Sequence, residues 1–114
     1  MALQGTIRQV EDIVIIDFSG KITLGEGSST LRNTIRTALD AGNRKILLNL
    51  SDVDYIDSSG IGEMVSAYTT VRGLSGELKL VYLTKRVHDL IQITRLFTVF
   101  DVQADEHSAL RSFK

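Results

Sequence analysis

Two hydroxyls and a carboxylate stand together near the middle of the chain, in the run Asp57-Ser58-Ser59-Gly60-Ile61-Gly62. The apolar run before it, Lys45 to Leu50, is typical of a strand that is covered on both faces. After it, apolar residues recur at helical spacing, beginning with Ile61 and Met64. A serine at such a junction lies at a helix N-terminus, where free N–H groups and the helix dipole favour negative charge. The segment therefore predicts a phosphorylation switch before it predicts an active site.

Each of these polar residues also has an ordinary structural interpretation. A serine at a helix start commonly acts as the N-cap, and on spacing alone either Ser58 or Ser59 can fill that position. Asp52, Asp54 and Asp57 place three carboxylates within six positions. We interpret Asp52 and Asp54 as solvated turn residues and expect Asp57 to act electrostatically or by hydrogen bonding beside the helix start.

Two glycines and three apolar residues near the serines leave alternatives open. Gly60 and Gly62 cost a helix roughly 0.5–1 kcal/mol each relative to alanine, so close approach of a partner or tight packing on the sheet should explain them. Ile22 and Leu24 fall in an expected loop, where polar residues are usual. Together with Met64 they form either an exposed contact patch beside Ser58 or a part of the core.

Other candidate motifs are incomplete. The run from Gly25 to Thr30 lacks the third glycine of a dinucleotide site and the ending of a P-loop, so it predicts a flexible loop leading into a helix and no cofactor. The two histidines, His88 and His107, lack metal-site spacing, and a serine hydrolase would need a Gly-x-Ser-x-Gly elbow that is absent. The basic residues Lys85-Arg86 and Arg95 have no interleaved aromatic residues. We predict a protein that is not an enzyme.

Composition narrows the class of protein further. The chain has 114 residues, 43% of them hydrophobic and 24% charged, which predicts one globular domain over residues 1–114. A net charge of −1 gives no general attraction to nucleic acid. There is no cysteine, no secretory signal pattern and no apolar run long enough to span a membrane. We expect a cytoplasmic protein without a membrane partner.

Periodicity predicts the elements that must position Ser58. Strands alternate with helices after an initial hairpin, which implies an α/β fold with a mainly parallel sheet, an antiparallel N-terminal strand and about four flanking helices. The loop after Gly20 and the Ser58 loop then share the carboxyl edge of the sheet. The expected strands are 6–10, 13–18 (ended by Gly20), 45–50, 78–83 and 98–102; the expected helices are 28–41 (capped by Gly42), 58–73, one begun by Thr84 and one begun by Asp105.

The Asp57–Gly62 run, the strand and loop that precede it, and the earlier strand closed by Phe18-Ser19-Gly20 resemble the STAS domain family. In length and element order the chain is similar to the stand-alone anti-sigma factor antagonists of bacteria. It departs from them after Gly20, where members often carry acidic residues and this chain has Lys21.

The resemblance implies a binding switch. Unphosphorylated protein would bind an anti-sigma factor that is also a serine kinase of the GHKL type, and a sigma factor would be released for transcription. ATP would belong to the kinase, and a PP2C-type phosphatase would reset the switch. The implied phosphoacceptor is Ser58, with Ser59 as the fallback, and the implied partner-binding residues are Ile22, Thr23, Leu24, Asp57, Ser58, Ser59, Gly60, Ile61 and Met64.

Two other functions fit the predicted fold. One is a STAS subunit of a sensory or transport-associated assembly, with a constitutive interface and no phosphorylation. The other is a receiver-like domain that accepts phosphate on an aspartate. The receiver-like domain requires an acidic pair after its first parallel strand, where this chain reads Phe18-Ser19-Gly20-Lys21.

Overall fold

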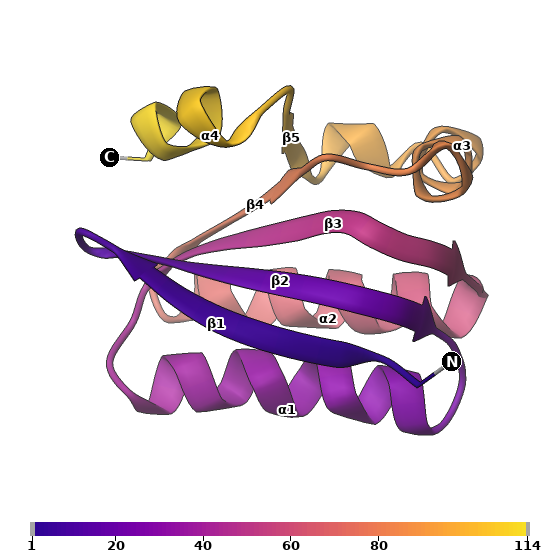
Figure 1. Cartoon of the computed structure of the whole chain (residues 1–114), viewed down its shortest axis with the longest axis horizontal. Helices are drawn as coiled ribbons and strands as arrows, with labels where there is room; N and C mark the ends of the chain where they lie inside the picture. The colour runs from indigo at the N-terminus through magenta and orange to yellow at the C-terminus, as the bar shows by residue number, and fades with distance from the viewer. Residues whose placement is uncertain (1, 114) are drawn as a thin grey trace.

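The computed structural model describes residues 2–113 and contains a five-stranded sheet in the order β1-β2-β3-β4-β5 (Figure 1). β1 pairs antiparallel with β2, and every later pair is parallel. The predicted α/β class and the antiparallel N-terminal strand are confirmed. The strands are β1 Gln4–Val10, β2 Ile13–Ile22, β3 Lys45–Ile56, β4 Glu77–Val81 and β5 Asp101–Gln103.

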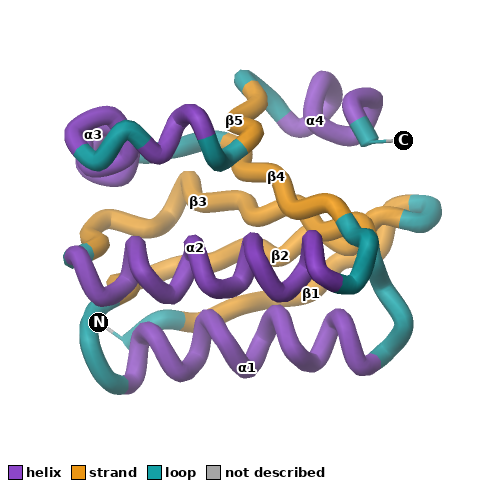
Figure 2. The backbone as a smooth tube through the Cα atoms, turned by 180° about the vertical axis from the view of Figure 1, so that it is seen from behind, coloured by secondary structure: helices purple, strands orange, loops and turns teal. Residues whose placement is uncertain are grey.

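Over the described residues, four α-helices and one short 3-10 helix connect and cover the strands. The helices α1 and α2 lie side by side against one face of the sheet, as both views show (Figure 2). The larger hydrophobic core lies between these helices and the sheet. No helix among the described residues is long and apolar enough to cross a membrane. The helices are α1 Glu26–Asp40, α2 Ser58–Gly73, α3 Lys85–Ile93, η1 Leu96–Thr98 and α4 Glu106–Ser112.

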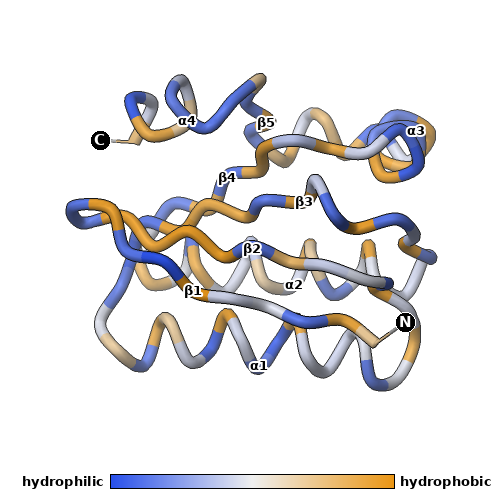
Figure 3. The backbone as a smooth tube through the Cα atoms, viewed as in Figure 1, coloured by the Kyte–Doolittle hydropathy of each residue, from blue (hydrophilic) through white to orange (hydrophobic). Residues whose placement is uncertain are grey.

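The start of β2 is a continuous apolar run (Figure 3), which is explained by burial on both faces. Val14 and Ile16 belong to the large core, whereas Ile13 and Ile15 belong to a second, smaller cluster. The C-terminal helix α4 closes that second cluster with Ala109. The expectation of a strand covered on both sides is confirmed here.

β2 continues past Gly20, so the prediction that this glycine ends the strand was wrong. The pairing with β3 shifts register on both sides of Gly20, which marks an irregularity inside the strand. Gly20 has φ +110°, and a Cβ there would lie 2.4 Å from the carbonyl oxygen of Ala2. The glycine therefore serves a strained backbone and a close approach of the N-terminal segment.

β3 also runs further than predicted, to Ile56. Residues 51–56, expected as a loop, belong to this strand: Asp52 and Asp54 are exposed, whereas Val53 and Ile56 are buried. Asp52 and Asp54 are thus the outward residues of a strand, and their interpretation as turn residues was wrong. Because both strands are longer than predicted, β2 and β3 both end close to the start of α2 at Ser58.

The C-terminal half departs from prediction where the backbone turns left-handed. Tyr82 has φ +58°, and β4 ends before it, at Val81, instead of at 83. The expected strand 98–102 is instead η1, introduced by Arg95 at φ +60°, followed by the short β5. Tyr82 and Arg95 are not residue types that usually indicate a left-handed turn, so the sequence did not predict these turns.

Helix boundaries agree better with the sequence. Gly42 follows the end of α1 with φ +95° and donates its N–H to the carbonyl of Leu39, as a C-terminal cap should. Thr84 accepts from the backbone of Val87 and begins α3. Asp105 accepts from Ser108 and begins α4, so the three predicted caps are confirmed.

Candidate functional site

Ser58 is the first residue of α2, directly beyond the carboxyl end of β3. Its side chain is exposed and makes no hydrogen bond to any residue between 2 and 113. The N-cap is the preceding residue, Asp57, whose extended backbone (φ −107°, ψ −178°) ends the strand. The expectation that Ser58 or Ser59 caps the helix was therefore wrong. Phosphorylation of the Ser58 hydroxyl would therefore break no hydrogen bond within the described residues.

The side chain and the N–H of Asp57 make three hydrogen bonds that fix the start of α2, in addition to the helical bond from Ile61 to its carbonyl. Its Oδ1 accepts from the N–H of Gly60 at 2.8 Å. Its Oδ2 accepts from the N–H of Leu24 at 3.1 Å, and its own N–H donates to the carbonyl of Ile22 at 3.2 Å. The expected hydrogen-bonding role of Asp57 is confirmed. The side chain holds the helix start and the loop after β2 in one fixed arrangement.

The two glycines of the run have different surroundings. A Cβ at Gly60 would lie 2.2 Å from the carbonyl oxygen of Ile22, so tight packing against β2 requires glycine there. A Cβ at Gly62 would meet nothing within 4 Å, and this residue is exposed. Packing within the chain therefore explains Gly60 and does not explain Gly62.

The apolar residues near Ser58 divide into core and surface. Ile22 and Met64 are fully buried (0% exposed), and Ile61 is 6% exposed. The hypothesis of an exposed patch that includes Ile22 and Met64 was wrong, because these side chains complete the core beneath the helix start. Leu24 is 77% exposed and carries the apolar character of this surface.

The loop that presents Leu24 is held from both sides. Thr23 accepts two hydrogen bonds from Ser28, one from its backbone and one from its hydroxyl, each 2.9 Å long. A Cβ at Gly27 would lie 2.7 Å from the carbonyl oxygen of Lys21, so this glycine lets the start of α1 pack against the end of β2. Gly27 thus has a packing role, whereas Gly25 has φ +92° and open space around it. The expectation of a flexible loop over residues 25–30 was wrong, because α1 begins at Glu26.

A basic cluster around Tyr55 was missed from the sequence. Tyr55, at the end of β3, carries Arg86 at 4.5 Å and Lys21 at 5.6 Å from its ring centroid. Lys21 also lies 3.5 Å from a carboxylate oxygen of Asp54. Lys21 and Tyr55 are partners in the β2–β3 register, so a correct register would have placed them together. Arg86 comes from α3, and no local pattern joins it to them.

The histidines take no part in this surface. His88 and His107 are exposed residues of α3 and α4, and Nδ1 of His88 lies 3.6 Å from Asp89. A triad of Ser58, His88 and Asp57 is therefore not assembled, since Asp57 bonds Gly60 and Leu24 instead. Within the described part of the chain, no three His, Cys, Asp or Glu side chains are grouped so as to hold a metal ion.

Comparison with known proteins agrees with this architecture. The STAS domain model matches residues 5–109, and the chain belongs to the STAS domain family. The anti-sigma-B factor antagonist of Bacillus subtilis is 26% identical over 111 residues, covering 97% of this chain and all of the relative. The anti-sigma F factor antagonist of Paenibacillus polymyxa is 25% identical and covers 96% of this chain and 94% of its own.

Solved structures share the fold at lower identity. An anti-sigma factor antagonist from Mycobacterium paratuberculosis superposes with a TM-score of 0.87 at 17% identity, covering 98% of this chain and 94% of that one. The phosphorylated form of the Bacillus cell fate determinant SpoIIAA superposes with a TM-score of 0.70 at 19% identity, covering 95% of this chain and 98% of that one.

Proposed function

We propose that this protein is an anti-sigma factor antagonist and that phosphorylation of Ser58 switches its binding. The observation that carries the proposal is an exposed, unbonded serine at the N-terminus of α2, held in a rigid frame beside the exposed Leu24. An acceptor must be accessible, and a partner needs a defined surface around it. Ser58 meets both conditions, and Ser59, which is partly buried, is the fallback acceptor.

The relatives support the general function. Both the B. subtilis and the P. polymyxa relatives are anti-sigma factor antagonists, and they align over almost the entire chain. The structural neighbour SpoIIAA exists in a phosphorylated form, so this fold can carry a phosphate. By this likeness the protein acts in the cytoplasm by binding and performs no catalysis of its own.

The partner in this scheme is an anti-sigma factor that is also a GHKL-type serine kinase. It binds ATP and the unmodified surface, and it transfers the γ-phosphoryl group of ATP to the hydroxyl of Ser58, leaving ADP. A PP2C-type phosphatase removes the phosphate and restores binding. The contact surface consists of Thr23, Leu24, Asp57, Ser58 and Ser59, together with the backbone at Gly60 and Ile61 and the open position Gly62.

The physical basis of the switch is a difference between two environments. A phosphate on Ser58 adds about 1.5–2 negative charges at a helix N-terminus, where the dipole favours them. The folded domain therefore tolerates it. At a protein interface the same charges must be desolvated next to the carboxyl group of Asp57, which accepts two hydrogen bonds. Phosphorylation thus weakens binding without unfolding the domain.

The test uses purified GHKL-type kinases encoded in the same genome, incubated with ATP, Mg²⁺ and the protein. Mass spectrometry should locate one phosphate on Ser58, with none on a Ser58→Ala variant and retention on Ser59→Ala. Modification of Ser59 alone, or binding without modification by any of these kinases, would overturn the assignment of Ser58. The second of these results would favour a constitutive STAS interface.

A further inference from the structure

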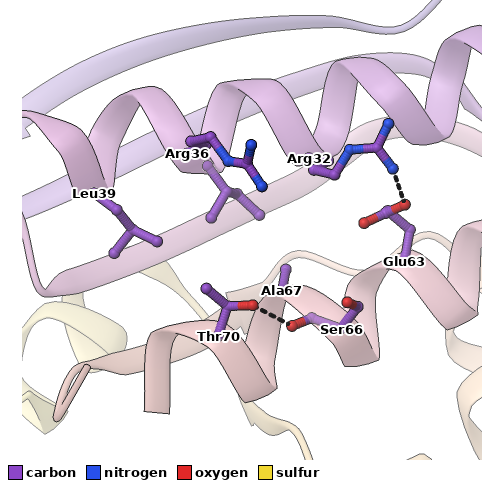
Figure 4. Close-up of a pocket in the computed structure, with 8 residues that line it drawn as sticks. Arg32, Arg36, Leu39, Glu63, Ser66, Ala67 and Thr70 are labelled. Carbon is purple, nitrogen blue, oxygen red and sulfur yellow. Dashed lines mark hydrogen bonds and ion pairs between the residues drawn. The ribbon is translucent and has the colours of Figure 1, made fainter. Parts of the chain in front are cut away.

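A groove between α1 and α2 lies outside the surface assigned to the switch (Figure 4). It has a volume of about 90 Å³. A single water needs roughly 10–15 Å³ by the same kind of measure, so the groove holds several waters or one small ligand. Its lining residues are Arg32, Ile35, Arg36, Leu39, Glu63, Ser66, Ala67 and Thr70.

The floor of the groove is apolar and its rim is basic. Ile35, Leu39 and Ala67 form the floor and are 3%, 8% and 7% exposed. Arg32 and Arg36 project over the groove from α1, one helical turn apart (Figure 4). A small ligand here would meet apolar carbon on one side and guanidinium groups on the other.

The positive charge of the rim is only half neutralised. Arg32 donates to the carboxylate of Glu63 at 3.0 Å and to the hydroxyl of Ser29 at 3.3 Å. Arg36 has no hydrogen bond and no acidic partner among residues 2–113. Like charges at i and i+4 destabilise a helix by about 0.2–0.5 kcal/mol. An anion placed between the two arginines would relieve that repulsion.

A hydroxyl on the opposite wall completes the set of donors. Thr70 donates its hydroxyl proton to the backbone carbonyl of Ser66 at 3.0 Å, so that proton is already used. The side-chain hydroxyl of Ser66 makes no hydrogen bond to the described residues. Ser66 is exposed and lines the groove. The groove therefore offers the N–H groups of Arg36 and the O–H of Ser66 to one ligand.

We propose that this groove binds a small carboxylate with a short aliphatic body. The guanidinium of Arg36 matches a carboxylate in two parallel hydrogen bonds, and the aliphatic body lies over Ile35, Leu39 and Ala67. Phosphate has no aliphatic part and would leave the apolar floor uncovered. We therefore expect the groove to bind the aliphatic carboxylate more tightly than phosphate. The site is independent of Ser58 phosphorylation and of the partner proposed above.

The test is a titration of the isotope-labelled protein with butyrate, followed by backbone and arginine side-chain NMR. Saturable shifts should occur at Arg36, Ser66, Ala67 and Thr70, with a dissociation constant of about 1–10 mM, as expected for a ligand of this size. Acetate, which lacks the aliphatic body, should bind more weakly. Inorganic phosphate and chloride at matched ionic strength should give no saturable shift at these residues.

Three variants make the result specific. Arg36→Gln should weaken butyrate binding about tenfold or more, since a charge-assisted pair is lost. Glu63→Gln should tighten it about two- to fivefold, because Arg32 is released from its present partner. Arg111→Gln is the matched control: Arg111 is an exposed arginine of α4, away from the groove, and its loss should change nothing. Absence of saturable shifts, an unchanged affinity in Arg36→Gln, or tighter binding of phosphate than of butyrate would overturn the proposal.

Discussion

The carboxylate of Asp57 and the backbone N–H of Leu24 are joined by a 3.1 Å hydrogen bond between residues 33 positions apart in the chain. The other oxygen of the same carboxylate caps α2 through Gly60. One side chain therefore sets the position of Ser58 relative to Leu24. The surface offered to a partner is preorganised, so binding need not order a loop.

This relationship predicts that neighbouring residues differ sharply in their effect on stability. Asp57→Ala should lower the free energy of unfolding by about 1–3 kcal/mol, because the helix cap and the bond to Leu24 are both lost. Ser58→Ala should change it by no more than about 0.5 kcal/mol, since this exposed hydroxyl has no partner. Urea denaturation of both variants measures the difference. Equal losses would mean that Ser58 takes part in the cap.

The two glycines of the α2 start should respond in opposite directions to alanine. Gly60→Ala forces a methyl group against the carbonyl oxygen of Ile22 and should destabilise the protein by about 2 kcal/mol or more. Gly62→Ala fills open space and should stabilise it by about 0.5–1 kcal/mol. Thermal melting compares them directly. If Gly62 serves the approach of a partner, its alanine variant should bind that partner less well despite its higher melting temperature.

Burial separates the apolar residues into two experimental classes. Ile22→Asp and Met64→Asp place a carboxylate in the core and should cost about 4 kcal/mol or more, enough to unfold a marginal domain. Leu24→Asp changes a 77% exposed side chain. It should leave the melting temperature unchanged and lower the affinity for the partner. Circular dichroism reports the folding of all three. A folded Met64→Asp variant would contradict the burial described here.

Asp17 should contribute to stability in a pH-dependent manner. It accepts from Arg8 at 2.5 and 2.9 Å and from Asn49 at 2.8 Å. The hydrogen bond from Arg8 holds the pKa of Asp17 below its ordinary value, although partial burial acts in the opposite direction. The folded state therefore releases this proton more readily than the unfolded state, whose pKa is about 3.9. The stabilisation is complete above that pH and is lost as the pH falls through the folded pKa.

The corresponding variant is Asp17→Asn, which should lose about 1–2 kcal/mol at pH 7 and less at pH 3. Asp89→Asn is the control, because Lys85 lowers the pKa of Asp89 in an exposed pair of the kind that contributes little to stability. Urea denaturation at both pH values measures these changes. A loss at pH 7 that persists undiminished at pH 3 would show that the charge of Asp17 is not responsible.

The sequence predicted the elements and their order because periodicity and caps are local signals. The blocks Ile13–Ile16 and Ile46–Leu48 identified buried strands, and Thr84 and Asp105 identified helix starts. The ends of β2 and β3 were misjudged because Gly20 and the alternating aspartates are usual turn signals. The pairing of β2 with β3, which continues through Gly20 and Val53 to Ile22 and Ile56, shows that they lie inside the sheet.

Only part of the site could be predicted, because only part of it depends on local sequence signals. The position of Ser58 followed from a local junction of strand and helix. The bond between Asp57 and Leu24, the burial of Met64 and the stacking of Arg86 on Tyr55 depend on contacts between distant segments. The α1–α2 groove likewise combines Arg36 from one helix with Ser66 from another, and neither residue is distinctive in its own segment.

The central claim is that phosphate on Ser58 weakens partner binding in a domain that stays folded. Calorimetry with the purified anti-sigma partner, comparing unmodified and phosphorylated protein, tests it most directly. Introducing a desolvated charge at an interface should reduce affinity by roughly 30-fold or more. The melting temperature should stay the same or rise, because the phosphate lies at the N-terminus of α2. Equal affinities of the two forms would contradict the switch, even if Ser58 proves to be phosphorylated.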